Sequence, residues 1–430
     1  MRTLKASVLM CMAAAAALAG CSDTESDGDA ASNGATTSNS TATSNGGADA
    51  GQTSGDMDTG ASDMDTGAAD MDTGEVVDPT AWALNEDGPF NVGFRSWEVV
   101  YTSPANGEER TIVFNLWYPT EATEGAPATY LGLQAFEDAE VYTDAPPAAS
   151  VYGGTYPVLV HSHGHQGFGG VSSDLMKHVA SHGWIAVAPD HTDNTLADTI
   201  EPKPTDLFIH RATDITACLD TLEDLGDDDP LAGKANTARV VLSGHSFGVY
   251  TTWAAGGATP DIDALRATCA PGTETEPFNN WEASCTEMEL SAFEAGLGDP
   301  RIVGLIPMAG GYDKVFFGED GWQSVTAPVL YMSGSEDNPT RVEGNFEDLV
   351  GDAIWVNLEG GVHESFGLCG TLDPDGTGLC STLPPDVAYP LVNTYALAFL
   401  RRHVLDDDSD MVEAILTGET VPEHVSFRAR

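Results

Sequence analysis

Residues 244–248 read Gly-His-Ser-Phe-Gly, so that Ser246 stands between two glycines in the spacing Gly-x-Ser-x-Gly. An apolar run precedes this pentad at 240–242, and a run of small residues that suits a helix follows it. A serine lifted clear of a strand on a sharp turn is held in a strained backbone conformation, and its neighbours two residues away pack too closely for a side chain. The pattern therefore predicts a nucleophile elbow with Ser246 as the nucleophile.

A serine hydroxyl is a poor nucleophile unless a general base lies within hydrogen-bond reach of it. His363 follows the last strand predicted before the final helix, within Gly-Gly-Val-His-Glu-Ser. The other two histidines downstream, His403 and His424, fall in that helix and in the tail. We therefore expect His363 to be the base.

An acid must orient this base, and in this kind of site the chain order is serine, acid, histidine. Asp337 follows the predicted strand 328–332, within Ser-Gly-Ser-Glu-Asp, and is the expected acid. Two alternatives stay open, namely the adjacent Glu336 and Asp313, which follows the preceding strand.

The oxyanion that forms during attack on an ester needs two backbone N–H groups aimed at it. One is expected from Phe247, directly after the nucleophile. The other is expected from His165, in the loop after Ser-His-Gly at 162–164. Only the amides of these two residues are invoked, so both side chains are free to shape a pocket.

A metal-dependent site is the rival hypothesis, because His161, His163 and His165 alternate, and three imidazoles with a water make a catalytic zinc site. His191 follows a neighbouring predicted strand. We expect the first strand to end at His161 and Gly164 to bend the chain, so the three rings should not share one face. We predict neither a metal nor a cofactor.

The elements that must position these residues alternate between strand and helix, which is typical of a mostly parallel sheet with right-handed crossovers. The first two strands should form an antiparallel hairpin that Pro119 ends. Besides the run before the pentad, the predicted strands are 97–101, 111–118, 156–161, 185–188, 301–308, 328–332 and 353–358, and the predicted helices are 174–182, 207–225 and 387–404.

Five stretches of the chain together match a known pattern. They are Leu-Trp-Tyr-Pro at 116–119, Ser-His-Gly at 162–164, Ala-Ser-His-Gly at 180–183 with Ala-Pro-Asp-His at 188–191, Arg-Ala-Thr-Asp-Ile at 211–215, and the pentad. In them the chain resembles Ser-dependent α/β-hydrolases of the platelet-activating-factor acetylhydrolase and predicted dienelactone hydrolase group. The resemblance implies an α/β-hydrolase fold, Asp337 as the acid, and a short-chain carboxylic ester as substrate. Phospholipid acetyl esters and polyesters are alternatives.

The chain departs from that group at two positions. Val249 follows the pentad where the related proteins usually have a second glycine, which bears on helix packing. Ser246 stands where true dienelactone hydrolases use cysteine, which weakens that substrate assignment. A surface binding module with a vestigial elbow is the hypothesis from a different class, and the filled triad positions argue against it.

The N-terminus has the three regions of an export signal: Arg2 and Lys5, an apolar stretch at 8–19, and a small-residue end at Cys21. The apolar stretch is too short to span a membrane. Leu-Ala-Gly-Cys resembles the bacterial lipobox, which implies that a signal peptide, 1–20, is removed and that Cys21 carries lipid. We expect an exported lipoprotein at the outer membrane or cell surface, in contact with the membrane only through this anchor.

A second segment, 21–80, should be a disordered acidic tether before a catalytic domain at 81–430. After Cys21 it contains no aromatic residue, no Lys or Arg and no Leu or Ile. Such a composition cannot bury enough apolar surface to offset the entropy lost on ordering. Three copies of Asp-Met-Asp-Thr-Gly favour a polar spacer, with weak calcium binding as the alternative.

The whole chain carries 67 acidic and 17 basic residues, a formal net charge of −50. Nucleic acids and anionic headgroups attract basic patches, so this surface argues against both as partners. The expected partner is a small-molecule or lipid ester, and the oligomeric state stays open.

Disulfides are permitted in an exported protein, and short separations suggest Cys269 with Cys285 and Cys369 with Cys380. The first pair would staple an insertion, 256–299, which is either a lid or rim of the pocket or an excursion away from it. The second pair would brace the loop of the predicted base.

Overall fold

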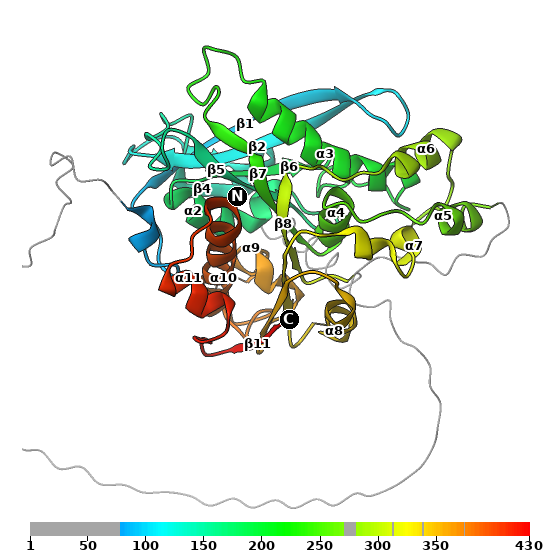
Figure 1. Cartoon of the computed structure of the whole chain (residues 1–430). Helices are drawn as coiled ribbons and strands as arrows, with labels where there is room; N and C mark the ends of the chain where they lie inside the picture. Colours follow the sequence, from blue (N-terminus) through cyan, green and yellow to red (C-terminus); the bar gives the residue numbers. More distant parts are fainter. Residues whose placement is uncertain (1–77, 271–280, 312–313, 338, 374) are drawn as a thin grey trace, which may run out of the picture. The chain divides into compact units, whose positions relative to one another are not determined.

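A computed structural model describes residues 78–270, 281–311, 314–337, 339–373 and 375–430 (Figure 1). The predicted signal peptide, Cys21 and the predicted tether up to residue 77 lie outside these ranges, as does the alternative acid Asp313. Among the residues described, no helix combines the length and apolar character needed to cross a membrane.

The strands of the described ranges join into one eleven-stranded sheet in the order β11-β10-β9-β8-β7-β5-β6-β2-β1-β4-β3. Six neighbouring strands, from β6 to β10, run parallel to one another, and β2 and β11 pair antiparallel at the two ends of this block. The bounds are β1 (Asn91–Thr102), β2 (Glu109–Thr120), β3 (Pro127–Thr129), β4 (Glu137–Thr143), β5 (Tyr156–Ser162), β6 (Ile185–Asp190), β7 (Ala235–His245), β8 (Ile302–Met308), β9 (Val329–Gly334), β10 (Ala353–Leu358) and β11 (Val425–Ala429).

Helices cover both faces of the sheet (Figure 1). Their bounds are α2 (Ser173–Ser181), α3 (Thr205–Glu223), α4 (Phe247–Ala255), α5 (Ile262–Thr268), α6 (Glu287–Ala295), α7 (Lys314–Phe317), α8 (Pro339–Asp348), α9 (Cys369–Leu372), α10 (Pro385–Leu405) and α11 (Asp410–Leu416). The expected architecture, a mostly parallel sheet flanked by helices, is confirmed.

The parallel strands are buried on both faces because alternate side chains enter two different apolar clusters. In β5, Val158 and Val160 belong to the cluster that contains the buried side chains of α3 and α4. Leu159, between them, belongs to the cluster that contains those of α2 and α10. This two-sided burial explains why these strands read as continuous apolar runs in the sequence.

The chain reverses its direction of travel across the sheet at β5. From β5 it first goes to β6 on one side, and it then returns to β7 on the other side of β5 and continues outward to β10. Loops that follow the carboxyl ends of strands diverge at such a switch point and leave room for a ligand. In this protein the switch point lies between the loop after β5 and the turn after β7, which start from adjacent strands.

Several predicted strand boundaries are wrong. Strand β1 begins at Asn91 rather than at residue 97, and β5 ends at Ser162 rather than at His161. Strand β2 continues through Pro119 to Thr120, whereas the proline was expected to end it. The pairing of β2 with β6 stops at Trp117, so the missing N–H of Pro119 lies where β6 no longer needs a hydrogen-bond donor.

Candidate active site

The nucleophile elbow lies where β7 ends and α4 begins. Ser246 is partly exposed between them, with φ 55° and ψ −117°, a left-handed backbone that is strained for a residue with a side chain. A Cβ on Gly244 would lie 2.2 Å from the carbonyl oxygen of Gly248, and one on Gly248 would lie 2.0 Å from that of Ser162. Both glycines of the pentad are therefore required by close backbone approach.

Three predicted site residues meet at this elbow. His363 Nε2 lies 2.9 Å from Ser246 Oγ, and His363 Nδ1 lies 3.0 Å from Asp337 Oδ2. The imidazole that donates Nδ1–H to the carboxylate leaves Nε2 free to accept the serine proton. Asp337 follows β9, and His363 opens a short 3₁₀ helix, η7 (His363–Phe366), after β10.

The alternative residues for these positions lie elsewhere. Glu336, beside Asp337, is exposed. Its carboxylate accepts a hydrogen bond of 3.4 Å from the hydroxyl of the adjacent Ser335. Among the downstream histidines, His403 lies on α10 and His424 is exposed just before β11. Of the residues that the structure describes, Asp337 is the carboxylate hydrogen-bonded to His363 Nδ1.

His245, the second residue of the pentad, contacts the histidine loop, which the sequence did not reveal. It is buried, and burial together with the nearby His363 lowers the pKa of its imidazole to about 3. Its Nε2 lies 2.8 Å from the carbonyl oxygen of His363, so the neutral ring donates a hydrogen bond there. His245, which directly precedes the nucleophile, thus fixes the backbone of the predicted base His363.

The loop after β5 passes directly alongside the nucleophile. An added Cβ on Gly164 would lie 3.1 Å from Ser246 Cβ, and the ring of the next residue, His165, lies 6.3 Å from that of Phe247. Within the described ranges, no acceptor is hydrogen-bonded to the amide of His165 or of Phe247. Phe247 is the first residue of α4, where backbone N–H groups lack a helical partner.

The side chains of the alternating histidines diverge. His161 Nδ1 lies 2.9 Å from Ser243 Oγ on β7, whereas His163 Nδ1 donates to the carbonyl of Gly164 and its Nε2 accepts the His191 N–H. The described part of the chain contains no group of three or more His, Cys, Asp or Glu that could hold a metal ion. No described group therefore supplies the ligands that the zinc hypothesis requires.

His165 is turned toward the loop after β6. Its Nδ1 accepts a hydrogen bond of 2.7 Å from Asn194 Nδ2, and its Nε2 donates to the carboxylate of Glu201. Because burial lowers the pKa of its imidazole to about 3, the ring is neutral at physiological pH. These contacts fix the orientation of the His165 ring.

The insertion 256–299 is stapled by the expected disulfide between Cys269 and Cys285. Residues 271–280 of the insertion lie outside the described ranges. After them, Trp281 packs its ring 5.7 Å from that of Phe208, which in turn lies 5.2 Å from the ring of Phe247. The returning end of the insertion therefore joins the apolar core behind the elbow, through Phe208.

The second expected disulfide, Cys369–Cys380, is also present, and both cysteines are buried. Cys369 begins α9, shortly after η7. Tyr389 on α10 donates its hydroxyl to the carbonyl of Gly367 at 2.8 Å and accepts the N–H of Gly370. The disulfide and the tyrosine together hold the segment that follows His363.

The sheet order, the helices on both faces and the elbow after β7 define an α/β-hydrolase fold. A family model described as chlorophyllase matches residues 146–264, a segment with the loop after β5 and the elbow but without Asp337 and His363. Among solved structures, the chain is similar to a ferulic acid esterase from Streptomyces cinnamoneus, with 19% sequence identity and a TM-score of 0.53. That similarity covers 79% of this chain and 96% of the esterase. No match was found among curated proteins.

Proposed function

We propose that the chain is a serine-dependent carboxylic ester hydrolase that acts through an acyl-enzyme. The observation that carries the proposal is the placement of His363 between Ser246 Oγ, at 2.9 Å, and Asp337 Oδ2, at 3.0 Å. These are the distances over which a base can take a proton from a nucleophile and an acid can orient the base. The chlorophyllase family match and the esterase neighbour support the same class of reaction.

In the proposed mechanism, Ser246 Oγ attacks the ester carbonyl while His363 Nε2 takes the hydroxyl proton. Asp337 orients His363 and stabilises the imidazolium that forms. The amides of Phe247 and His165 stabilise the oxyanion, and His363 then returns the proton to the departing alcohol. A water, activated by the same histidine, releases the acid from the acyl-enzyme. The reaction needs no cofactor.

The resemblance to the platelet-activating-factor acetylhydrolase group supports a short-chain carboxylic ester as substrate. Phospholipid acetyl esters and polyesters remain alternatives within the same chemistry, and the structural neighbour, a ferulic acid esterase, adds ferulic acid esters to the panel of candidates. Buried aromatic side chains pack behind the elbow, with the rings of Phe208 and Tyr250 at 5.2 and 5.8 Å from that of Phe247. They fix the position of Phe247 and do not by themselves select an acyl or alcohol group.

The first test compares the initial rate of p-nitrophenyl butyrate hydrolysis by the wild type and by Ser246→Ala, each with and without a chelator. We expect the substitution to lower the rate by at least about a thousandfold, because the nucleophile is lost, and the chelator to have no effect. A rate that survives the substitution but is abolished by the chelator would favour a metal site. Absence of hydrolysis across acetyl, butyryl, longer-chain and feruloyl esters would leave the surface binding module as the better hypothesis.

We also propose that Cys21 carries a lipid anchor and that the residues after it, up to 77, tether the catalytic domain to the outer membrane or cell surface. The expected end of the tether at residue 80 is too late, because the carbonyl of Thr80 accepts a hydrogen bond from Arg401 of the domain. The lipobox-like sequence and the acidic, apolar-poor composition of the segment support this. Mass spectrometry of the protein purified from its own cells tests it. An unmodified Cys21, or cleavage at another site, would contradict the proposal.

A further inference from the structure

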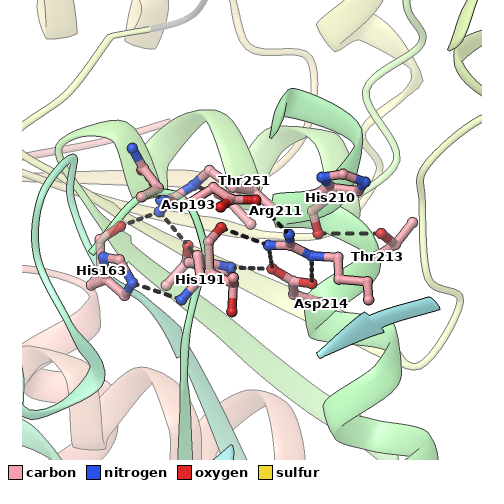
Figure 2. Close-up of polar contacts among 12 residues, drawn as sticks. His163, His191, Asp193, His210, Arg211, Thr213, Asp214 and Thr251 are labelled. Carbon is pink, nitrogen blue, oxygen red and sulfur yellow. Dashed lines mark hydrogen bonds and ion pairs between the residues drawn. The ribbon is translucent and has the colours of Figure 1, made fainter. Parts of the chain in front are cut away.

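Arg211 is a fully buried residue of α3 whose guanidinium joins three separate segments (Figure 2). Its Nη2 donates to Ser162 Oγ at 3.0 Å and to the carbonyl of His163, both at the end of β5. Its Nη1 donates to Asn194 Oδ1 at 2.6 Å, after β6, and its Nε donates to Thr251 Oγ1 at 3.0 Å, on α4. One planar side chain therefore fixes the loop after β5 relative to the helix that follows the nucleophile.

The same guanidinium contacts Phe247 directly and His165 through Asn194. The amides of Phe247 and His165 are the two proposed to stabilise the oxyanion. The Cζ of Arg211 lies 4.5 Å from the centre of the Phe247 ring, within range of a cation–π contact. On the other side, Asn194 accepts from Arg211 through Oδ1 and donates through Nδ2 to His165 at 2.7 Å. Arg211 is thus one contact away from His165 and in direct contact with Phe247.

A buried ion pair joins Arg110 of β2 to Asp214 of α3 and does not include Arg211. Asp214 accepts two hydrogen bonds from Arg110, at 2.8 and 2.9 Å, and one from His191 Nδ1 at 2.8 Å. Although burial opposes it, the Arg110 guanidinium holds the pKa of Asp214 well below its usual range. His191 Nε2 in turn lies 2.9 Å from Ser162 Oγ, which completes the support of the strand end.

Within the described ranges, every hydrogen-bond acceptor of Arg211 is neutral: two hydroxyls, an amide oxygen and a backbone carbonyl. Burial lowers the pKa of Arg211 to about 9, which still leaves it charged at neutral pH. The guanidinium is therefore held by the loop after β5, the loop after β6 and α4 rather than by a carboxylate.

We propose that Arg211 is a positioning residue that holds the amides of Phe247 and His165 in place for the oxyanion, an inference that rests on the proposed ester hydrolysis. Arg211 reaches the reaction only through the residues it holds. This role also explains two residues of the Arg-Ala-Thr-Asp-Ile stretch at 211–215. Arg211 holds the loop after β5, and Asp214 accepts a hydrogen bond from His191.

The test uses full-length Arg211→Lys, which keeps the charge but loses the planar set of donors, and Thr251→Val, which removes one acceptor at nearly constant volume. Thr251→Ser, which retains the hydroxyl, is the rescue variant. Arg401→Lys is the matched control, because Arg401 is equally buried but lies on α10 and bonds Asp407. Each variant is measured for kcat and KM per site titrated with a fluorophosphonate, and for hydrogen–deuterium exchange of peptides covering 162–168 and 246–250.

We expect Arg211→Lys to lower kcat by about ten- to a hundredfold with KM changed by less than about threefold, because orientation rather than binding is lost. Thr251→Val should lower kcat less, by about three- to tenfold, and Thr251→Ser should recover most of that loss. Both peptides should exchange faster in Arg211→Lys and Thr251→Val. Arg401→Lys should lower the melting temperature without these effects.

An unchanged kcat per titrated site, or unchanged exchange of the two peptides, in folded Arg211→Lys would overturn the inference. If that variant does not fold, the comparison of Thr251→Val with Thr251→Ser decides by the same criteria. If the wild type hydrolyses no ester of the panel, the proposed function fails. The exchange measurement then decides by itself whether Arg211 holds the loop.

Discussion

Asp337 and Glu336 are adjacent carboxylates, and only Asp337 is hydrogen-bonded to His363 Nδ1. We therefore predict that Asp337→Asn lowers kcat by about 10³- to 10⁴-fold, because an amide no longer favours the required tautomer or stabilises the imidazolium. Glu336→Gln, which removes a neighbouring charge, should change kcat by less than about threefold. Steady-state kinetics on p-nitrophenyl butyrate measure both. Equal losses in the two variants would contradict the assignment of Asp337.

At this scale, local signals predict residues that the structure brings together. The glycines two residues to either side predict Ser246, and chain order and the preceding strands predict His363 and Asp337. His363 lies within hydrogen-bond distance of both Ser246 and Asp337. The catalytic roles of the three residues stay predictions. The contact of His245 with the His363 carbonyl joins residues 118 positions apart, and Arg211 contacts loops that lie far from it in sequence. Such contacts depend on how elements pack, and no spacing along the chain encodes them.

The disulfide Cys369–Cys380 follows the element that carries His363, whereas Cys269–Cys285 staples the insertion near Phe247. Replacing either pair by serine should lower the melting temperature, because a closed loop restricts the unfolded chain. We predict that loss of the Cys369–Cys380 pair lowers kcat by about threefold or more, through a loosened histidine loop. Loss of the other pair should act mainly on KM.

Thermal denaturation and steady-state kinetics of the two double variants test this distinction. Each pair serves as the control for the other, because both close loops of similar length, 11 and 16 residues. An unchanged kcat without Cys369–Cys380 would show that Tyr389 alone is sufficient to hold the segment.

Elements were predicted well where their pattern is long and repetitive. The bounds of β10 match the prediction, and α3 and α10 differ from it by one or two residues at each end. The sequence did not reveal β3, β4 and β11, which are three to seven residues long and lie toward the edges of the sheet. Each has a single buried residue and is otherwise exposed or half-buried, without a continuous apolar run, so pairing partners rather than composition define them.

The whole domain contains several imidazoles that burial keeps neutral. Burial lowers the pKa of His161, His191 and His245 to about 3, below the value near 6.5 expected in the unfolded chain. The unfolded state therefore binds more protons as pH falls below about 6.5, and stability present above this pH is lost toward acid. Each imidazole contributes a slope of about 1.4 kcal/mol per pH unit.

We predict that the melting temperature falls steadily between pH 7 and pH 5. Three carboxyls oppose the trend, because burial raises the pKa of Asp190 to about 6 and also raises the pKa of Asp174 and Asp193, so that their protonation favours the folded state. We expect the buried imidazoles to outweigh these carboxyls. Thermal denaturation at constant ionic strength measures the effect, and a melting temperature that is constant or rises toward pH 5 would contradict it.

The net charge of −50 should make the folded state sensitive to salt. Mutual repulsion of acidic groups weakens as the Debye length shrinks from about 10 Å at 0.1 M to about 3 Å at 1 M ionic strength. We predict that sodium chloride raises the melting temperature over this range by more than a non-ionic osmolyte of equal osmolality. Thermal scans in the two additives make the comparison, and equal shifts would argue against electrostatic screening.

The first described residues are clamped to the buried Arg401 of α10. Its guanidinium donates to the carbonyl of Thr80 at 2.5 Å and to that of Trp82 at 3.1 Å, while Asp407 holds its Nε at 2.6 Å. Any mechanical load carried by the chain before Asp78 must enter the domain at this clamp. The pull is then borne by α10, the helix whose Tyr389 also holds the segment after His363, so that drag or shear on the chain is passed toward the loop of the predicted base.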